Sequence, residues 1–503
     1  MSQSSIEIGA VSQRWKFWAL LAGPLLGLLT YWLLPEHYAS VTSPGVEVPF
    51  SYEGKACLGV TVWMAVWWFT EALPIAATAL LPLMAYPILQ ITTPQQAMVN
   101  YASSTIFLFL GGFLLAAGIH RWHLDRRIAL LTLKFFGTKP SQMILGLMTA
   151  TAFLSAWVSN TATVAMMVPI AISVLGVIRS AQTSETPSIE EKNFGIAVLL
   201  AIAFSASIGG MATLIGSPPN GIFVRFMEQT YGQTITFTEW MTVALPIVAC
   251  LMPACYLLLT KVVFPCKIDG IPGGREWVRD ELLKLGDMTR GEKVVLAVFA
   301  TAALMWIFGP WIRGFEIDGA RPFAPFRDEI IAMCAGMALF VLPVDIDRHI
   351  HALDWQSAKD VVAWDVLLLF GGGLTMAAAI QSTGAASLIG AQAASFAGLG
   401  EIPMIAGVAS LVAVATEMTS NTALAATMMP LIAAAAESLN MNPEALLYAT
   451  VLATSCAFMM PVATPPNAII FSTGRIRIID MLKAGVLLDI FAVMLITVVV
   501  KFL

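Results

Sequence analysis

Long apolar runs separated by short polar connections dominate the hydrophobic pattern of this chain. A helix needs about 20 residues to cross about 30 Å of hydrocarbon, and eleven stretches suit such a crossing. These predicted spans lie near residues 15–34, 55–72, 73–92, 105–120, 195–226, 240–264, 292–312, 328–343, 363–380, 444–473 and 482–502. The pattern therefore predicts an all-α polytopic membrane protein.

Two further apolar runs, at 141–177 and 403–436, are too long for one span, and Ser-Asn-Thr interrupts each of them near its middle. A single helix of about 35 residues would be longer than about 50 Å, because each residue adds about 1.5 Å. Two half-length helices that meet at a polar tip fit the pattern better. We therefore expect two re-entrant hairpins.

The hairpins belong to a repeated series of motifs. TIFLFLGGFLLAAGI (105–119) matches DVLLLFGGGLTMAAAI (365–380), and ATLIGSPPNGIF (212–223) matches PVATPPNAIIF (461–471). Lys and Arg concentrate in four connections, at 121–139, 264–293, 344–362 and 475–483. Basic connections face the cytoplasm, so we expect a cytoplasmic N-terminus and hairpins that enter from opposite sides. Such an inverted-topology repeat with interrupted helices is typical of secondary transporters.

Composition agrees with a membrane protein and narrows the function. Of the 503 residues, 58% are hydrophobic and 12% are charged, whereas soluble domains carry about 25% charged residues. The net charge of -5 and the absence of a basic stripe give no reason to expect a nucleic-acid partner. A serine nucleophile needs an adjacent base, and neither Ser-Asn-Thr motif has a His or Lys nearby. We therefore do not expect an enzyme.

The interruptions carry polar residues that could bind cations. Non-helical backbone at membrane depth is tolerated where it lines a cavity, and Pro-Pro frees the carbonyl groups before it. Ser155 and Ser159 stand four residues apart, as do Thr416 and Ser420, so we expect each pair to share a helical face. Each pair could form an oxygen cage for a hard cation. The carbonyl groups that could complete the two cages belong to Gly216 and Ala463.

An anion would fit between the two cages. Helices that restart at Thr161 and Thr422 would present free N–H groups and a positive dipole end, and Asn160 and Asn421 would add neutral donors. The four motifs contain no Lys or Arg, so anion binding would depend on the bound cations. A single Ser-Asn-Thr could simply bond back to its own helix or join two helices. The duplication with two Pro-Pro-Asn breaks favours the binding interpretation.

These motifs, SNTATVAMMVP, SNTALAATMMP, GSPPN and ATPPN in this order, resemble the divalent-anion/sodium symporter family over nearly the whole chain. The resemblance implies a homodimer in the cell's inner (plasma) membrane that takes up C4-dicarboxylates (succinate, malate, fumarate) with sodium ions. The first sodium site would comprise Ser155, Ser159, Asn160 and Gly216, and the second Thr416, Thr419, Asn421 and Ala463. The substrate-binding residues would be Asn160, Thr161, Ser217, Asn421, Thr422, Thr464 and Pro465.

The resemblance also implies an elevator, in which a transport part slides through a scaffold. The scaffold would comprise 1–137 (helices 1–4 and a basic arm at 121–137) and 265–402 (helices 7–9, a cytoplasmic loop and an arm at 381–397). The transport part would comprise 138–264 (first hairpin, broken helix 5 and helix 6) and 403–503 (second hairpin, broken helix 10 and helix 11).

Several alternatives stay open at this stage. A sodium-independent di- or tricarboxylate exchanger and a proton-coupled anion carrier would share the fold, whereas hairpins from opposite sides fit alternating access better than a channel. The first break reads Ser-Pro-Pro and the second Thr-Pro-Pro, which leaves dicarboxylate, citrate and sulfate open. Acids within a membrane are candidates for function, so Glu417 and Asp489 could be proton or orientation sites, or hydrogen-bonded buried acids.

Overall fold

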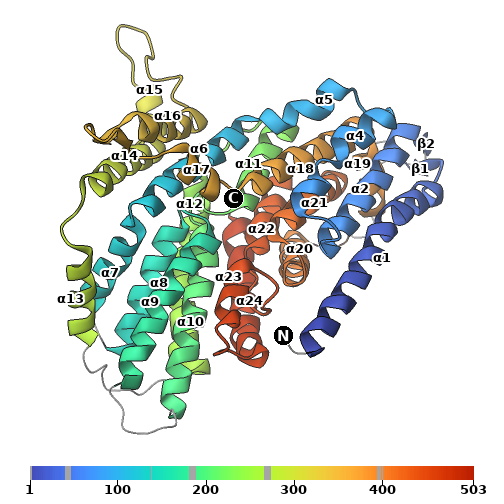
Figure 1. Cartoon of the computed structure of the whole chain (residues 1–503). Coiled ribbons are helices and arrows are strands. Elements are labelled where there is room, and N and C mark those ends of the chain that lie inside the picture. Colours follow the sequence, from blue (N-terminus) through green and yellow to red (C-terminus); the bar gives the residue numbers. More distant parts are fainter. Residues whose placement is uncertain are drawn as a thin grey trace.

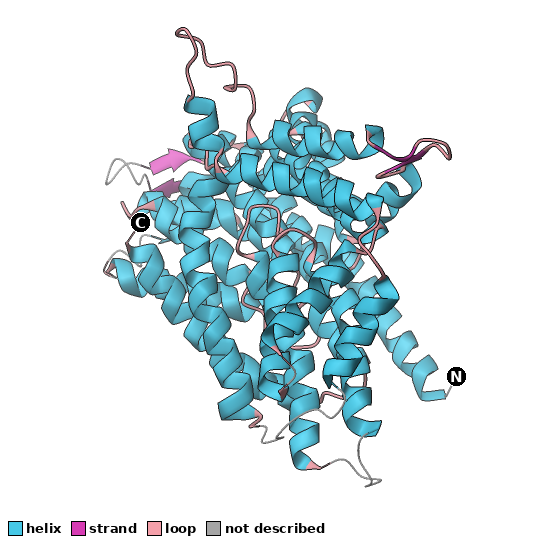
Figure 2. Ribbon diagram, turned by 90° about the vertical axis from the view of Figure 1, so that its left-hand side faces the viewer, coloured by secondary structure: helices cyan, strands magenta, loops and turns pink. Residues whose placement is uncertain are grey.

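The architecture is that of a computed structural model, which describes residues 3–39, 47–137, 139–180, 188–265, 274–393, 398 and 400–502. Most of these residues are helical (Figure 2). The described strands form two short antiparallel pairs, β1 (His37–Ala39) with β2 (Glu47–Pro49) and β3 (Pro343–Asp345) with β4 (Ile350–His351). The hydrophobic pattern does not predict them, because strands of two or three residues carry no periodic signal.

The first part of the chain starts on one side of the molecule with α1 to α4 and crosses to the other side, where α6 packs beside α16 (Asp328–Val341) (Figure 1). Its elements are α1 (Gln3–Leu33), α2 (Tyr52–Thr70), α3 (Ile75–Ala79), α4 (Leu81–Ile88), α5 (Pro94–Val99), η1 (Asn100–Ala102) and α6 (Ser104–Arg121). The predicted span at 73–92 is divided at Leu80 into α3 and α4. Pro82 explains the division, since proline removes a backbone donor and disfavours a continuous helix.

Both runs predicted to be hairpins form two helices joined by a short tip. The first hairpin is α8 (Pro140–Ser155) and α9 (Asn160–Ser180), and the second is α20 (Glu401–Thr416) and α21 (Asn421–Ser438). The helix–break–helix prediction is therefore confirmed. The second helix of each hairpin begins one residue earlier than predicted, at Asn160 and Asn421. The serine just before each start accepts a hydrogen bond from the backbone amide three residues later and so caps the helix.

Two further helices are interrupted where Pro-Pro-Asn occurs. The first comprises α10 (Ile189–Gly210) and α11 (Pro218–Tyr231), and the second α22 (Pro443–Thr454) and α23 (Pro465–Ser472). Each resumes at the first proline of the motif, which suits the first turn of a helix because no N–H partner is needed there. The hairpins and broken helices then exchange partners: α9 packs against α23, and α21 packs against α11. The hairpin of each repeat therefore packs against the broken helix of the other repeat.

The remaining elements complete the helical body in Figure 1. They are α7 (Leu124–Phe136), α12 (Phe237–Leu257) with its π-helical extension η2 (Leu258–Val263), α13 (Gly274–Leu285), α14 (Arg290–Ile307), α15 (Gly309–Gly314), α16 (Asp328–Val341), α17 (Trp355–Val361), α18 (Trp364–Ser382), α19 (Ala385–Ala393) and α24 (Ile478–Lys501). Helices α7 and α19 occupy the two predicted arms, although 394–397 of the second arm lie outside the described residues.

Seven helices within the described part of the chain are long and apolar enough to cross a membrane. Others, such as the segment 75–88 and α20, are apolar but shorter. The structure is thus that of a polytopic helical membrane protein. The number of eleven spans stays a prediction, as does the entry of the hairpins into the bilayer from opposite sides.

The basic arm helix α7 is held by ion pairs. Arg126 Nη2 lies 2.7 Å from Glu281 Oε2, and Lys284 Nζ lies 2.5 Å from Glu281 Oε1. Hydrogen bonds from Lys284 and Arg126 lower the pKa of the Glu281 carboxyl, so it stays charged at neutral pH. Arg127 pairs with the buried Glu292 of α14 at 2.5 Å. Helix α7 is thereby fixed to α13 and α14.

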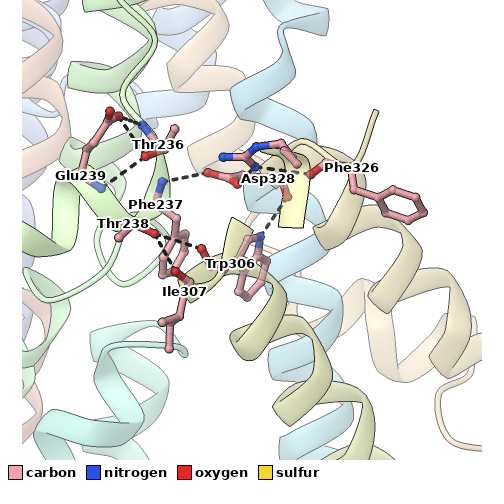
Figure 3. A network of polar contacts seen from close by, with 9 residues as sticks. Thr236, Phe237, Thr238, Glu239, Trp306, Ile307, Phe326 and Asp328 are labelled. Carbon is pink, nitrogen blue, oxygen red and sulfur yellow. Dashed lines mark hydrogen bonds and ion pairs between the residues drawn. The ribbon is translucent and has the colours of Figure 1, made fainter. Parts of the chain in front are cut away.

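A polar network around Asp328 joins the starts of α12 and α16 to the end of α14 (Figure 3). Its carboxylate accepts hydrogen bonds from the Phe237 amide at 2.8 Å and from Arg313 at 3.0 Å, and its backbone carbonyl accepts one from the Trp306 indole at 3.0 Å. The Trp157 ring from the tip of the first hairpin stacks against the rings of Phe237 and Trp306. The first tip is therefore in contact with α12 and α14.

Candidate functional site

Both hairpin tips and both helix breaks face one cavity of about 810 Å³. The tips contribute 159–161 and 418–422, and the breaks contribute 215–219 and 462–466. All seven residues predicted to bind the substrate line this cavity: Asn160, Thr161, Ser217, Asn421, Thr422, Thr464 and Pro465. The fold therefore brings together residues that lie up to about 300 positions apart in the sequence.

The residues predicted to bind sodium divide into two groups. Six of the eight line the same cavity: Ser159, Asn160, Gly216, Thr419, Asn421 and Ala463. The other two, Ser155 and Thr416, lie behind the tips with their side chains fully buried. Of the six residues that line the cavity, Thr419 has a buried hydroxyl without a hydrogen-bond partner among the described residues. Its oxygen is therefore available to a ligand.

The expectation that Ser155 and Ser159 share a helical face is wrong, and the same holds for Thr416 and Ser420. Helix α8 ends at Ser155 and α20 ends at Thr416, so the following residues turn away from the helical path. The hydroxyl oxygen of Ser159 instead accepts a hydrogen bond from the Ala162 amide at 3.3 Å. Ser420 caps α21 in the same way. The second serine of each motif therefore starts a helix.

Ser155 makes its contacts at the first tip with two other oxygen atoms. Its hydroxyl lies 2.8 Å from the carbonyl oxygen of Ala206 and 2.5 Å from the side-chain oxygen of Asn160. The hydroxyl has only one proton to share between these two acceptors. A turn of the Asn160 amide would place its nitrogen toward the hydroxyl and resolve the conflict. The place is otherwise rich in oxygen atoms, which are the ligands that hard cations prefer.

The second tip repeats this arrangement. The Thr416 hydroxyl lies 2.8 Å from the carbonyl oxygen of Thr454 and 2.7 Å from the side-chain oxygen of Asn421. Residues at matching places in the two motifs thus make matching contacts. The duplication seen in the sequence is also a duplication of geometry.

Each break is held by the asparagine of its Pro-Pro-Asn motif, a residue for which no role was predicted. The Asn220 side-chain nitrogen donates to the carbonyl oxygens of Gly210 at 3.1 Å and Thr213 at 2.8 Å. Both partners lie in or beside the interruption of the first broken helix, and Asn220 is 1% exposed. It thus replaces bonds that a continuous helix would have made.

Asn467 does the same in the second break. Its nitrogen donates to the carbonyl oxygens of Ala457 and Met460, both at 3.0 Å, and the side chain is fully buried. The spacing from asparagine to acceptors is ten and seven residues in both copies. The repeated Asn of Pro-Pro-Asn was the signal that could have predicted this role.

Gly216 allows the first break to fold tightly against the first tip. A Cβ atom added there would lie 2.6 Å from the Gly210 carbonyl oxygen and 3.0 Å from that of Ala156. The Thr213 hydroxyl bonds to the same Ala156 carbonyl and accepts a hydrogen bond from the Gly216 amide at 3.2 Å. Only glycine fits without displacing these carbonyl groups, which lie beside the first predicted cage.

The two breaks differ at the residue before Pro-Pro. The Thr464 hydroxyl accepts a hydrogen bond from the Asn467 amide at 3.2 Å and so caps α23. Ser217 stands at the same position but its side chain does not cap α11. The Ser217 side chain lines the cavity without capping the helix that follows it.

Two hairpins and two interrupted helices that face one cavity are typical of secondary transporters. Comparison with known sequences gives the family: the family described as the sodium:sulfate symporter transmembrane region matches residues 18–502. The chain therefore belongs to this family, and the resemblance drawn from its four motifs is confirmed.

Individual relatives agree with this assignment. The sodium-dependent dicarboxylate transporter SdcS of Staphylococcus saprophyticus is 37% identical over 486 residues, which is 96% of this chain and 90% of that protein. SdcS of Staphylococcus aureus strain MRSA252 is 38% identical over 485 residues, with the same shares. The crystal structure of the Alcanivorax borkumensis YdaH transporter, which has an unusual topology, superposes with a TM-score of 0.58 over 98% of both chains. Because its identity is 12%, this likeness concerns the fold alone.

Proposed function

We propose that this protein is a symporter that imports C4-dicarboxylates, such as succinate, malate and fumarate, together with sodium ions. The observation that carries the proposal is the duplicated set of contacts around one cavity, at Ser155 and Asn220 in one half and at Thr416 and Asn467 in the other. The names of the relatives, sodium-dependent dicarboxylate transporters, support the choice of ion and substrate.

A dicarboxylate would bridge the two halves. Helices α9 and α21 begin at the cavity, and a helix N-terminus carries a partial positive charge of roughly half a unit. Thr161 and Thr422 follow directly and add hydroxyl donors. Each tip would thus bind one carboxylate without a basic side chain, together with the donors of its neighbouring break.

Sodium ions would occupy the oxygen-rich places behind and beside the tips. The first would be bound by Ser155, Ser159, Asn160 and Gly216, and the second by Thr416, Thr419, Asn421 and Ala463. These cations would offset the charge of the dianion, so that each ligand binds better when the other is present. This mutual dependence is the thermodynamic basis of coupling.

Transport would follow an elevator mechanism in a homodimer of the cell's inner (plasma) membrane. Residues 138–264 and 403–503 would move, and 1–137 and 265–402 would form the scaffold. The cavity is also lined by Lys16 in the middle of α1 and by Glu71 just after α2. With the predicted cytoplasmic N-terminus, these two residues would lie toward the cytoplasmic side of the cavity.

Uptake of labelled succinate into proteoliposomes tests the proposal. An inward sodium gradient should drive accumulation, and replacing external sodium with choline at fixed pH should abolish it. Unlabelled malate and fumarate should compete, whereas butyrate, with a single carboxylate, should not. Uptake that ignores sodium but responds to pH or to an internal anion would instead establish the proton-coupled carrier or the exchanger. Competition by citrate and sulfate would define the range of anions.

Two substitutions test the bridging geometry. Thr161→Ala and Thr422→Ala should each weaken succinate binding by about 10- to 150-fold, because a hydrogen bond to a charged group contributes about 1.5–3 kcal/mol. The matched control is Thr427→Ala on α21, whose hydroxyl donates to the Ala423 carbonyl of its own helix and, within the described part of the chain, to no other group. Normal transport by both tip variants would show that the tips do not jointly bind a dianion.

A further inference from the structure

A pair of acids lies behind the second break, outside the two predicted sodium cages. Glu417 follows Thr416 at the second tip and Asp489 lies in the middle of α24, with exposures of 3% and 6%. Their carboxyl groups lie close enough to interact directly. Neither forms an ion pair among the described residues. Two acids therefore share one buried place at membrane depth without a basic side chain.

Glu417 has an identified partner in the break itself. Its two carboxylate oxygens accept hydrogen bonds from the backbone amides of Met459 and Met460, both at 2.8 Å. These residues lead into the segment 462–466 that lines the cavity. Glu417 thus acts as a hydrogen-bonded buried acid, one of the roles expected from the sequence, and fixes the second break to the second tip.

Asp489 has no such partner. Both of its carboxylate oxygens are buried and accept no hydrogen bond. Helix α24 packs against α20 and α22, and a Cβ atom added at Gly485 would lie 2.5 Å from the carbonyl carbon of Phe458. One turn later, this close approach brings Asp489 to the break. A carboxylate held there has two oxygens free for a cation, whereas an acid without a cation would have to take up a proton.

The first repeat lacks this pair. Ala156 follows Ser155 at the place where Glu417 follows Thr416, and α12, which follows the first broken helix, has Glu239 of its first turn as its one acid. The two acids are therefore an addition to the second half alone. They are not part of the duplicated cage geometry.

We propose that Glu417 and Asp489 bind a monovalent cation, a sodium ion, at a site additional to the two cages and moving with the transport part. Oxygen ligands suit a hard cation, and the two backbone amides already offset part of the negative charge of Glu417. Divalent ions need more ligands: Ca²⁺ takes 6–8 oxygens and Mg²⁺ keeps several waters. No group of three or more acidic, His or Cys side chains suited to a metal occurs among the described residues.

This proposal rests on the proposed sodium-coupled function and predicts the coupling ratio. In proteoliposomes, the voltage at which net succinate flux vanishes under fixed gradients gives the number of sodium ions moved per succinate. Asp489→Asn should move one sodium ion fewer than the wild type. The matched control is Glu437→Gln, an exposed acid of the same hairpin whose carboxylate accepts a hydrogen bond from Tyr231, and it should keep the wild-type ratio. An unchanged ratio in Asp489→Asn would overturn the proposal.

A second measurement does not depend on the variant or on transport. Equilibrium binding of ²²Na⁺ to the purified wild-type protein should saturate at three ions per protomer, one for each cage and one for the acid pair. Saturation at two ions would overturn the additional site. In a separate transport assay, a proton moved by the wild type but not by Asp489→Asn would also overturn it, because the pair would then bind a proton. Failure of the proposed function is distinct: it would appear as wild-type uptake that persists in choline.

Discussion

Replacing either break asparagine with alanine should destabilise the protein more than an ordinary loss of one hydrogen bond. Asn220→Ala would remove two bonds and leave the buried carbonyl groups of Gly210 and Thr213 without this donor. An unsatisfied buried group costs about 1–3 kcal/mol, so the two together should lower the free energy of unfolding by roughly 2–6 kcal/mol. Asn467→Ala should have an effect of the same size, because its geometry is the same.

The measurement is chemical unfolding of the purified variants in detergent, followed by succinate binding under native conditions. The matched control is Asn193→Ala on α10, whose side-chain nitrogen donates one bond to the Pro265 carbonyl at an exposed position. It should cost less than about 1.5 kcal/mol, since water can replace the lost donor. Both break variants should also bind succinate more weakly, because the segments that line the cavity would lose their anchor.

The result that would refute this reasoning is a break variant as stable as the control. It would mean that water or a neighbouring donor already satisfies the freed carbonyl groups. A large loss of stability in one break and none in the other would show that the same hydrogen-bond geometry contributes differently to the free energy of unfolding in the two repeats.

Three further outcomes follow from the structure and the proposed function. Ser217→Ala should weaken succinate binding with little change in stability. Thr464→Ala should weaken binding and also remove the cap of α23, which should lower the free energy of unfolding by about 0.5–2 kcal/mol. Equal losses of stability in the two variants would contradict this. Trp157→Ala should lower the free energy of unfolding by about 0.5–1.5 kcal/mol for each stacked ring lost, Phe237 and Trp306, beyond the buried area, as thermal unfolding can measure. Uptake should be electrogenic because a third sodium ion, bound at Glu417 and Asp489, would leave one net positive charge after the two cage ions balance the dianion. One net charge moved across 100 mV changes the driving force by about 2.3 kcal/mol; indifference to a potassium–valinomycin potential would reject this and leave two sodium ions per dianion.

The hairpins and breaks could be predicted because each leaves a strong local signal. Apolar runs at 141–177 and 403–436 exceed the length of one span, and Pro-Pro interrupts any helix that contains it. The set of cavity residues followed from the same signals, since every predicted substrate residue lies in or beside a tip or a break. Local chemistry was sufficient for these features.

What could not be predicted depends on contacts between distant segments. A four-residue spacing predicts a shared helical face only while the helix continues, and α8 ends at Ser155. The roles of Asn220 and Asn467 depend on how the chain folds back across each break. The proximity of Glu417 and Asp489 depends on the packing of α24 at Gly485. Sequence periodicity contains none of this information.

The exchange of partners between the repeats has a consequence for biosynthesis. Helix α9 packs against α23, which begins at Pro465, about 285 residues after α9 ends. At roughly 5–20 residues per second, a ribosome needs roughly 15–60 s to deliver that partner. During this interval the polar tip of the first hairpin has only half of its protein environment. We expect the first half to require shelter from lipid by the insertion machinery, and two halves made as separate chains to assemble only when they are synthesised together.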